Sequence, residues 1–216
     1  MKKFDKLLIK AEQGDAEAQC NLGFYYYESK SVQKNLKKAV YWWKKAADQG
    51  DAEAQFHLGV CFLNGEGVRK NLEKAVNWLT KAAKQGHAPA QCDLGNCYYD
   101  GEGVTMSFKK AANWYSKAAE QGNAAAQFNL ALLYDSGRGV TRDPKKTVYW
   151  HTKAAEQGIP QSQFLLWWYY ISGLEVRKNT KKAVYWLTKA AEQGYRDAKV
   201  ILARRNSRLK SEEKKL

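Results

Sequence analysis

The stretch from Asp51 to Gly86 reads DAEAQFHLGVCFLNGEGVRKNLEKAVNWLTKAAKQG and recurs along the chain. Its closing Gln-Gly dipeptide returns at a fixed spacing of 36 residues, as from Gly50 to Gly86. A fixed period between about 20 and 50 residues is typical of proteins built from stacked repeats, in which each unit contacts only its neighbours. The sequence therefore predicts a solenoid.

Each repeat reads as a pair of helices. In this copy the first helix covers Ala52–Leu63, where apolar residues recur every four positions on one face. Asp51 precedes it as the N-cap, and the glycines of Asn64–Gly67 end it because glycine readily adopts positive φ. The second helix covers Leu72–Lys84 and again places its apolar residues three and four positions apart. One such hairpin cannot bury its apolar face alone, so neighbouring hairpins must stack.

We expect an all-α solenoid, a right-handed superhelix of about five 36-residue helical hairpins with a capping helix at each end. Residues 1–14 form the N-terminal capping helix, and residues 195–216 form a C-terminal capping helix, ending near Leu209, and a charged tail. The five hairpins between them cover residues 15–50, 51–86, 87–122, 123–158 and 159–194.

The repeat pattern resembles that of a known family. The motif A-x-A-Q-x-x-L-G-x-x-Y-x-x-G-x-G-V, followed by K-A-x-x-W-x-x-K-A-A-x-Q-G, is similar to the Sel-one-like repeat, a relative of the tetratricopeptide repeat. The resemblance covers nearly the whole chain and implies a scaffold or adaptor that binds other proteins. It also implies two alternatives: an immunity protein that neutralises a bacterial toxin, and, more distantly, a β-lactam-binding or β-lactam-hydrolysing protein of the kind found among cysteine-rich secreted members.

The chain is strongly basic, with a formal net charge of +14. Lysines recur seven positions apart on the second helix of every repeat, as at Lys74 and Lys81, and form an outward basic stripe. Such a stripe is either a solvated face or a surface for an acidic partner or nucleic acid. Because no base-reading helix, zinc knuckle or aromatic strand platform is recognisable, we expect no specific nucleic-acid partner.

The sequence indicates no catalytic, cofactor or metal site. The three histidines, His57, His87 and His151, fall in three different slots of three repeats, without the spacing of metal ligands. His57 is interpreted as a solvated or hydrogen-bonded residue at the edge of the groove. The four cysteines are expected to be free thiols, because equivalent slots in stacked helices lie beyond disulfide reach. These cysteines are Cys20, Cys61, Cys92 and Cys97.

We expect a cytoplasmic protein, because neither a signal peptide nor an apolar run long enough for a membrane span is recognisable. We also expect it to be bacterial and monomeric. No enzymatic activity is expected. The partner is another protein, for which the net charge favours an acidic one, with a toxin or effector among the candidates.

The candidate binding surface lies on the first helices, which line the concave side of tetratricopeptide arrays. On these helices, the positions next to the core-facing Ala, Leu and Tyr residues are unusually apolar and aromatic. Exposed patches of this kind mark binding sites. Trp167, in a slot that holds glycine in the first three repeats, should separate helices locally, so the strongest anchor is expected near the fifth repeat. The predicted partner-binding residues are Phe24, Tyr27, Phe56, Val60, Leu63, Asn96, Tyr99, Phe128, Leu132, Phe164 and Trp168.

Overall fold

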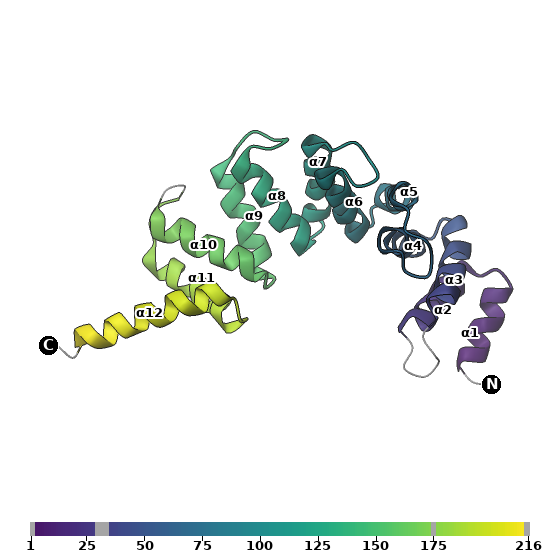
Figure 1. The fold of residues 1–216 in the computed structure, drawn as a ribbon, viewed down its shortest axis with the longest axis horizontal. Coiled ribbons are helices and arrows are strands. Elements are labelled where there is room, and N and C mark those ends of the chain that lie inside the picture. Colours follow the sequence, from purple (N-terminus) through teal and green to yellow (C-terminus); the bar gives the residue numbers. More distant parts are fainter. Residues whose placement is uncertain (1–2, 29–34, 174–175, 214–216) are drawn as a thin grey trace. The chain divides into compact units, whose positions relative to one another are not determined.

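The structure is a computed structural model that describes residues 3–28, 35–173 and 176–213. Within these ranges the chain forms helices and no strands, and the helices follow one another as tandem hairpins (Figure 1). The predicted all-α solenoid is therefore confirmed. The described helices are α1 (Lys3–Glu12), α2 (Ala16–Glu28), α3 (Leu36–Asp48), α4 (Ala52–Asn64), α5 (Leu72–Lys84), α6 (Ala88–Asp100), α7 (Phe108–Glu120), α8 (Ala124–Ser136), α9 (Pro144–Glu156), α10 (Pro160–Ser172), α11 (Thr180–Glu192) and α12 (Arg196–Glu213).

The chain divides into two compact units, Met1–Gln121 with α1 to α7 and Gly122–Leu216 with α8 to α12. In both, the first helices of the repeats alternate with the second helices, so that α2, α4, α6, α8 and α10 are first helices. The C-terminal helix α12 continues to Glu213, four residues beyond the predicted end. No helix in the described part of the chain is both long and apolar enough to cross a membrane.

Side chains at the helix ends explain where the helices begin. Asp51 accepts a hydrogen bond from the backbone N–H of Ala54 at 2.7 Å, as an N-cap residue does. The second helices start in the same way, for example at Asn71, whose side chain accepts from the N–H of Lys74. First helices α4, α6, α8 and α10 end at glycines with φ between 70° and 78°, such as Gly65. These short signals fix each hairpin independently of its neighbours.

Small and large residues alternate where the two helices of a hairpin cross. A Cβ added to Gly23 would lie 2.4 Å from the Trp43 ring, and one added to Gly95 would lie 2.6 Å from the Tyr115 ring. Trp43 and Tyr115 are almost fully buried, so these glycines provide the space that the large rings fill. Trp167, in the equivalent slot of the fifth repeat, is half-buried in the structure.

In the first, second, third and fifth repeats, a buried glutamine joins three consecutive helices. Gln55 on α4 donates from Nε2 to the Ala47 carbonyl oxygen at the end of α3, at 3.1 Å. Its Oε1 accepts from Gln85 Nε2 at 2.9 Å, just beyond α5. The glutamine pairs, 2.7–2.9 Å apart, are Gln19–Gln49, Gln55–Gln85, Gln91–Gln121, Gln127–Gln157 and Gln163–Gln193. We call this arrangement the glutamine joint.

All four cysteines are free thiols and are buried in the hairpin cores. Burial raises the pKa of each of them to about 12. Thiols with such a pKa remain protonated and unreactive at neutral pH.

Candidate partner-binding face

The first-helix face consists of the surface residues of α2, α4, α6, α8 and α10. The structure leaves all eleven predicted partner-binding residues exposed or half-buried. Cys20 and Cys92 hold the same slot as three of the phenylalanines but are buried, 6% and 4% exposed, and so add nothing to this surface. Whether the eleven residues bind a partner remains a prediction, but they are available to one.

In unit 1 an aromatic cluster on this face surrounds His57. The imidazole stacks on the Trp43 ring, with ring centroids 4.9 Å apart and planes inclined by 19°. Phe24 and Phe56 approach the same imidazole edge-on, with centroids 4.6 Å and 5.0 Å away. Packing against three rings holds His57 in place, and of the two states that the sequence left open, solvated or hydrogen-bonded, the structure shows the hydrogen-bonded one.

Glu53 brings together two of the three histidines. Its Oε1 lies 3.1 Å from His57 Nε2, and its Oε2 lies 3.0 Å from His87 Nε2. His87 Nδ1 accepts the N–H of Ala90 as the N-cap of α6, so its Nε2 carries the proton and donates to Glu53. Burial alone would raise the pKa of the Glu53 carboxyl, but the hydrogen bonds from the two histidines outweigh it and lower that pKa. The result is an anchored carboxylate whose side chain is 50% exposed.

Burial lowers the pKa of His57, although Glu53 acts in the opposite direction. The lowered pKa of His57 keeps its imidazole neutral at neutral pH, and the lowered pKa of Glu53 keeps its carboxylate ionised. Glu53 therefore carries a negative charge there, next to a neutral His57.

Other predicted residues of unit 1 are fixed by hydrogen bonds or ring contacts. The Tyr27 hydroxyl donates to Glu66 Oε2 at 3.1 Å, and the Tyr115 hydroxyl donates to Asn96 Oδ1 at 2.7 Å. The ring of Tyr99 packs against that of Phe108, with ring centroids 5.2 Å apart. These side chains already have defined positions, which lowers the entropy lost when a partner binds.

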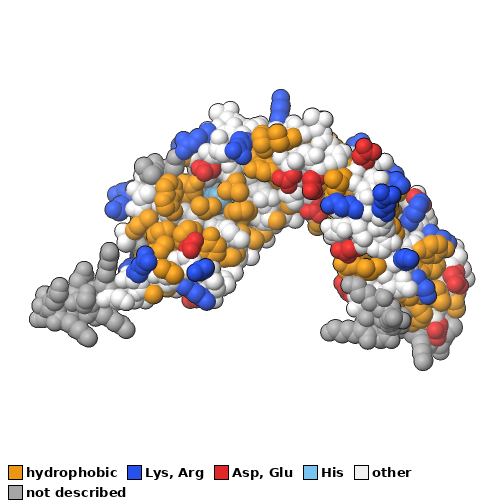
Figure 2. All heavy atoms as spheres, in the orientation of Figure 1, with side chains coloured by type: hydrophobic (Ala, Val, Ile, Leu, Met, Phe, Trp, Pro, Cys, Tyr) orange, Lys and Arg blue, Asp and Glu red, His pale blue; other side chains and the backbone are white. Residues whose placement is uncertain are grey.

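Unit 2 presents the most exposed apolar residues of the first-helix face. Leu132 on α8 is 37% exposed and Trp168 on α10 is 42% exposed. Phe128 and Phe164 are half-buried on the same two helices, and Phe164 contacts the Trp167 ring at 5.0 Å. Hydrophobic side chains of this unit reach the surface in Figure 2.

The second helices form a different surface, in which lysines lie over aromatic rings. Lys81 Nζ is 3.9 Å from the Trp78 ring centroid, and Lys117 Nζ is 4.5 Å from that of Trp114. Such cation–π contacts hold the recurring lysines against the surface without neutralising them. The predicted basic stripe is therefore an ordered feature of the second helices.

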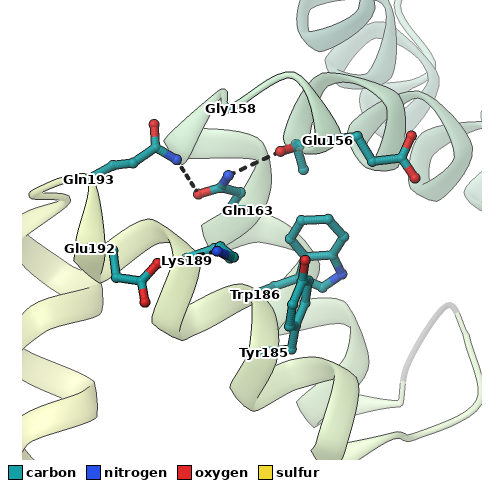
Figure 3. Close-up of a pocket in the computed structure, with 9 residues that line it drawn as sticks. Glu156, Gly158, Gln163, Tyr185, Trp186, Lys189, Glu192 and Gln193 are labelled. Carbon is teal, nitrogen blue, oxygen red and sulfur yellow. Dashed lines mark hydrogen bonds and ion pairs between the residues drawn. The ribbon is translucent and has the colours of Figure 1, made fainter.

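A pocket of about 390 Å³ opens beside α11 on this second surface (Figure 3). Lys189 projects into it but pairs with Glu192 at 3.4 Å, and Glu156 adds a second carboxylate. Gln163 and Gln193, at its edge, belong to a glutamine joint. Because its lining carries both signs of charge, the pocket does not select a ligand by charge.

The described residues contain no group of three or more His, Cys, Asp and Glu side chains placed to hold a metal ion. The meeting of His57 and His87 at Glu53 escaped the sequence reasoning, because the two histidines occupy different slots. One signal could have found it: Glu53 and His57 are four residues apart on one helix, and His87 begins the next first helix.

The chain matches the Sel1 repeat model at residues 16–51, 52–87, 88–123, 124–159 and 160–195. No curated protein matches it. Among solved structures, it is similar to a Sel1 repeat protein from Oxalobacter formigenes, with 36% identity and a TM-score of 0.79 over 86% of this chain and 74% of that one. It is also similar to a protective antigen of uropathogenic Escherichia coli displaying an SLR fold, with 33% identity and a TM-score of 0.59, over 93% of this chain but only 51% of that one.

An immunity protein from Pseudomonas aeruginosa has the same fold, with a TM-score of 0.53 over 85% of this chain and 67% of that one. Its identity to this chain is 24%, so the likeness concerns the fold alone. The five consecutive matches to the repeat model, which span most of the sequence, show that the chain belongs to the Sel1 repeat family.

Proposed function

We propose that this protein is a non-enzymatic scaffold or adaptor that binds a segment of another protein along its first-helix face. Sel1 repeats generally mediate protein–protein interaction. The observation that carries the proposal is the exposure of Leu132 and Trp168 on neighbouring first helices of unit 2. Large apolar side chains that remain accessible in a folded protein are typical of binding sites, and tryptophan is a frequent source of binding energy.

A peptide or a helix of the partner fits this surface best, because helical-repeat arrays present extended surfaces rather than closed cavities. The strongest anchor is expected on α10, at Trp168, with Phe164 beside it. The lysine-bearing second helices would then act at longer range, by steering an acidic part of the partner during encounter.

An immunity function is the second candidate. It would make the partner a toxin, and its support is the shared fold of the Pseudomonas aeruginosa immunity protein. A toxin gene beside the gene of this protein would favour it over a general adaptor.

The test begins with affinity capture of the partner from the native cell, identified by mass spectrometry. Calorimetry then compares the wild-type protein with Trp168→Ala, which should weaken binding by about 2 kcal/mol, or roughly thirtyfold. Tyr185→Ala is the matched control, because Tyr185 is an aromatic residue of the same unit, 53% exposed, but on a second helix. It should bind almost as the wild type does.

A double replacement of Lys74 and Lys110 by Ala should mainly change the association rate and its salt dependence. If folded Trp168→Ala binds normally while the lysine variant loses binding, the second helices form the site and the proposal is wrong.

A further inference from the structure

Charge is divided between the two kinds of helix. The first helices α2, α4, α6, α8 and α10 contain no lysine or arginine, whereas the second helices α3, α5, α7, α9 and α11 contain 16 lysines and five acidic residues. The basic character of the whole chain therefore does not describe the first-helix face. The acidic residues of the first helices are Glu17, Glu28, Glu53, Asp93, Asp100 and Asp135.

Unit 1 contains five of these six carboxylates, and neighbouring side chains hold or partly bury two of them. Glu53 is held by His57 and His87, as described above, and the rings of Phe24 and Phe56 pack against His57. Its charge is thus fixed in position on a side chain that is 50% exposed, next to a histidine that aromatic rings surround. Carboxylates beside aromatic rings form favourable surroundings for a cationic side chain.

Asp93, on α6, is the second carboxylate. It is half-buried, and burial raises its pKa, with His87 and Asn96 acting in the opposite direction. Its one polar side-chain contact among the described residues is Asn96 Nδ2, at 3.4 Å, and no lysine or arginine of these residues lies within ion-pair distance. A carboxylate that has lost part of its hydration without gaining a cation is stabilised when a cation arrives.

We propose that the first-helix face of unit 1 binds a basic segment of a protein partner, whose arginine or lysine side chains pair with Glu53 and Asp93. This inference rests on the proposed function, since it names the chemistry of the segment that this face would take. Arginine suits the site best, because its planar guanidinium can stack on Phe24 or Phe56 while it donates to a carboxylate. The adjacent phenylalanine rings would contact the apolar stems of the same side chains.

This assignment differs from the acidic partner that the net charge of +14 favours. The interaction between two charged groups is strongest at direct contact, and at ordinary salt concentrations the solution screens it beyond about 10 Å. A segment lying beside Glu53 and Asp93 therefore responds to these two carboxylates more than to the second-helix lysines, none of which among the described residues pairs with either carboxylate. An acidic segment would meet the carboxylates of Glu53 and Asp93 on this face and be repelled.

The experiment selects peptides of 16 residues from a random displayed library against the full-length protein. The enriched sequences should carry an excess of arginine and lysine and should include apolar residues. Synthetic copies of the enriched peptides are then titrated against Glu53→Gln/Asp93→Asn, which should bind them about tenfold more weakly. Glutamine has nearly the same shape as glutamate, and its amide oxygen can still accept the hydrogen bond from His87 Nε2. Circular dichroism checks that the variant folds.

The matched control is Glu73→Gln/Glu120→Gln, which also removes two carboxylates from unit 1, but exposed ones on second helices. It should change affinity less than twofold. Enriched peptides that are acidic or uncharged, or basic peptides that bind both double variants equally, would overturn the basic-segment inference and leave the proposed function in place. If no peptide is enriched, the proposed function fails as well, and the inference fails with it.

Discussion

Replacing His151 by leucine, together with Ser162 by alanine, should make the protein markedly less sensitive to acid. His151 is fully buried between α9 and α10, and its Nδ1 lies 3.1 Å from Ser162 Oγ. Its Nε2 is buried without a partner among the described residues. Burial lowers the pKa of this histidine to about 4, although Asp135 acts in the opposite direction.

The size of the effect follows from the difference between the folded and unfolded states. The ordinary histidine pKa is 6.5 and the folded value is about 4, which corresponds to roughly 3 kcal/mol between full protonation and full deprotonation. As the pH falls below 6.5, the unfolded state binds a proton before the folded state does, so stability is lost. The loss is nearly zero at pH 7, about 2 kcal/mol at pH 5, and nearly complete once the pH passes below 4.

The double replacement uses residues that other repeats hold in the same slots, Leu79 for His151 and Ala126 for Ser162. It therefore removes the buried titratable group without leaving an unpaired hydroxyl. Urea unfolding at pH 7 and pH 5 should show that the variant gains about 2 kcal/mol relative to the wild type on acidification. Hydrogen exchange in α9 and α10 should localise the gain to these repeats.

A single replacement, Ser162→Ala, is the control, because it keeps His151 and should keep the acid sensitivity. The reasoning is refuted if the stability difference between the double variant and the wild type is the same at both pH values.

Three further predictions concern the cores. Gly23→Ala should destabilise unit 1 by about 1–3 kcal/mol in thermal unfolding, because the new Cβ overlaps the Trp43 ring; unchanged stability would mean that the ring moves freely. Gln91→Ala should lose about 2 kcal/mol, since it removes two hydrogen bonds of a glutamine joint. Gln121→Ala removes one of these two and a long, exposed hydrogen bond to the Lys117 carbonyl oxygen, and should lose about half as much; equal losses would contradict this account of the joint. The four cysteines should react with a thiol reagent at neutral pH only after denaturation, and then all four should be counted without reduction; rapid reaction of the native protein would show that they are not buried.

Most of the fold could be predicted from the sequence because its information is local and repeated. Caps such as Asp51 and Asn71 mark helix starts, and the left-handed glycine at Gly65 marks an end, each within a few residues of the pattern it bounds. The end of α12 was predicted less well. The stretch from Lys210 to Leu216 was interpreted as a charged tail, but the helix continues to Glu213, since lysine and glutamate are good helix formers.

The candidate site was harder to predict. That the eleven residues would be accessible followed from helical periodicity, because positions one step off the core stripe turn toward solvent. The contacts of Glu53 with His57 and His87 depend on how two neighbouring first helices stack, and a single repeat does not specify this geometry. The division of charge between first and second helices was present in the sequence, but the net charge of the whole chain concealed it.

The glutamine joint has a consequence for how such a chain can change length. Every repeat carries both glutamines of a pair, the buried one on the first helix and the one after the second helix that meets it, as in Gln55 and Gln85. Duplication or loss of one whole 36-residue copy therefore leaves every joint with its partners. Evolution can therefore change the length of the first-helix face by adding or losing whole repeats, while substitutions change its exposed residues. The length of this surface and its binding specificity can then vary independently.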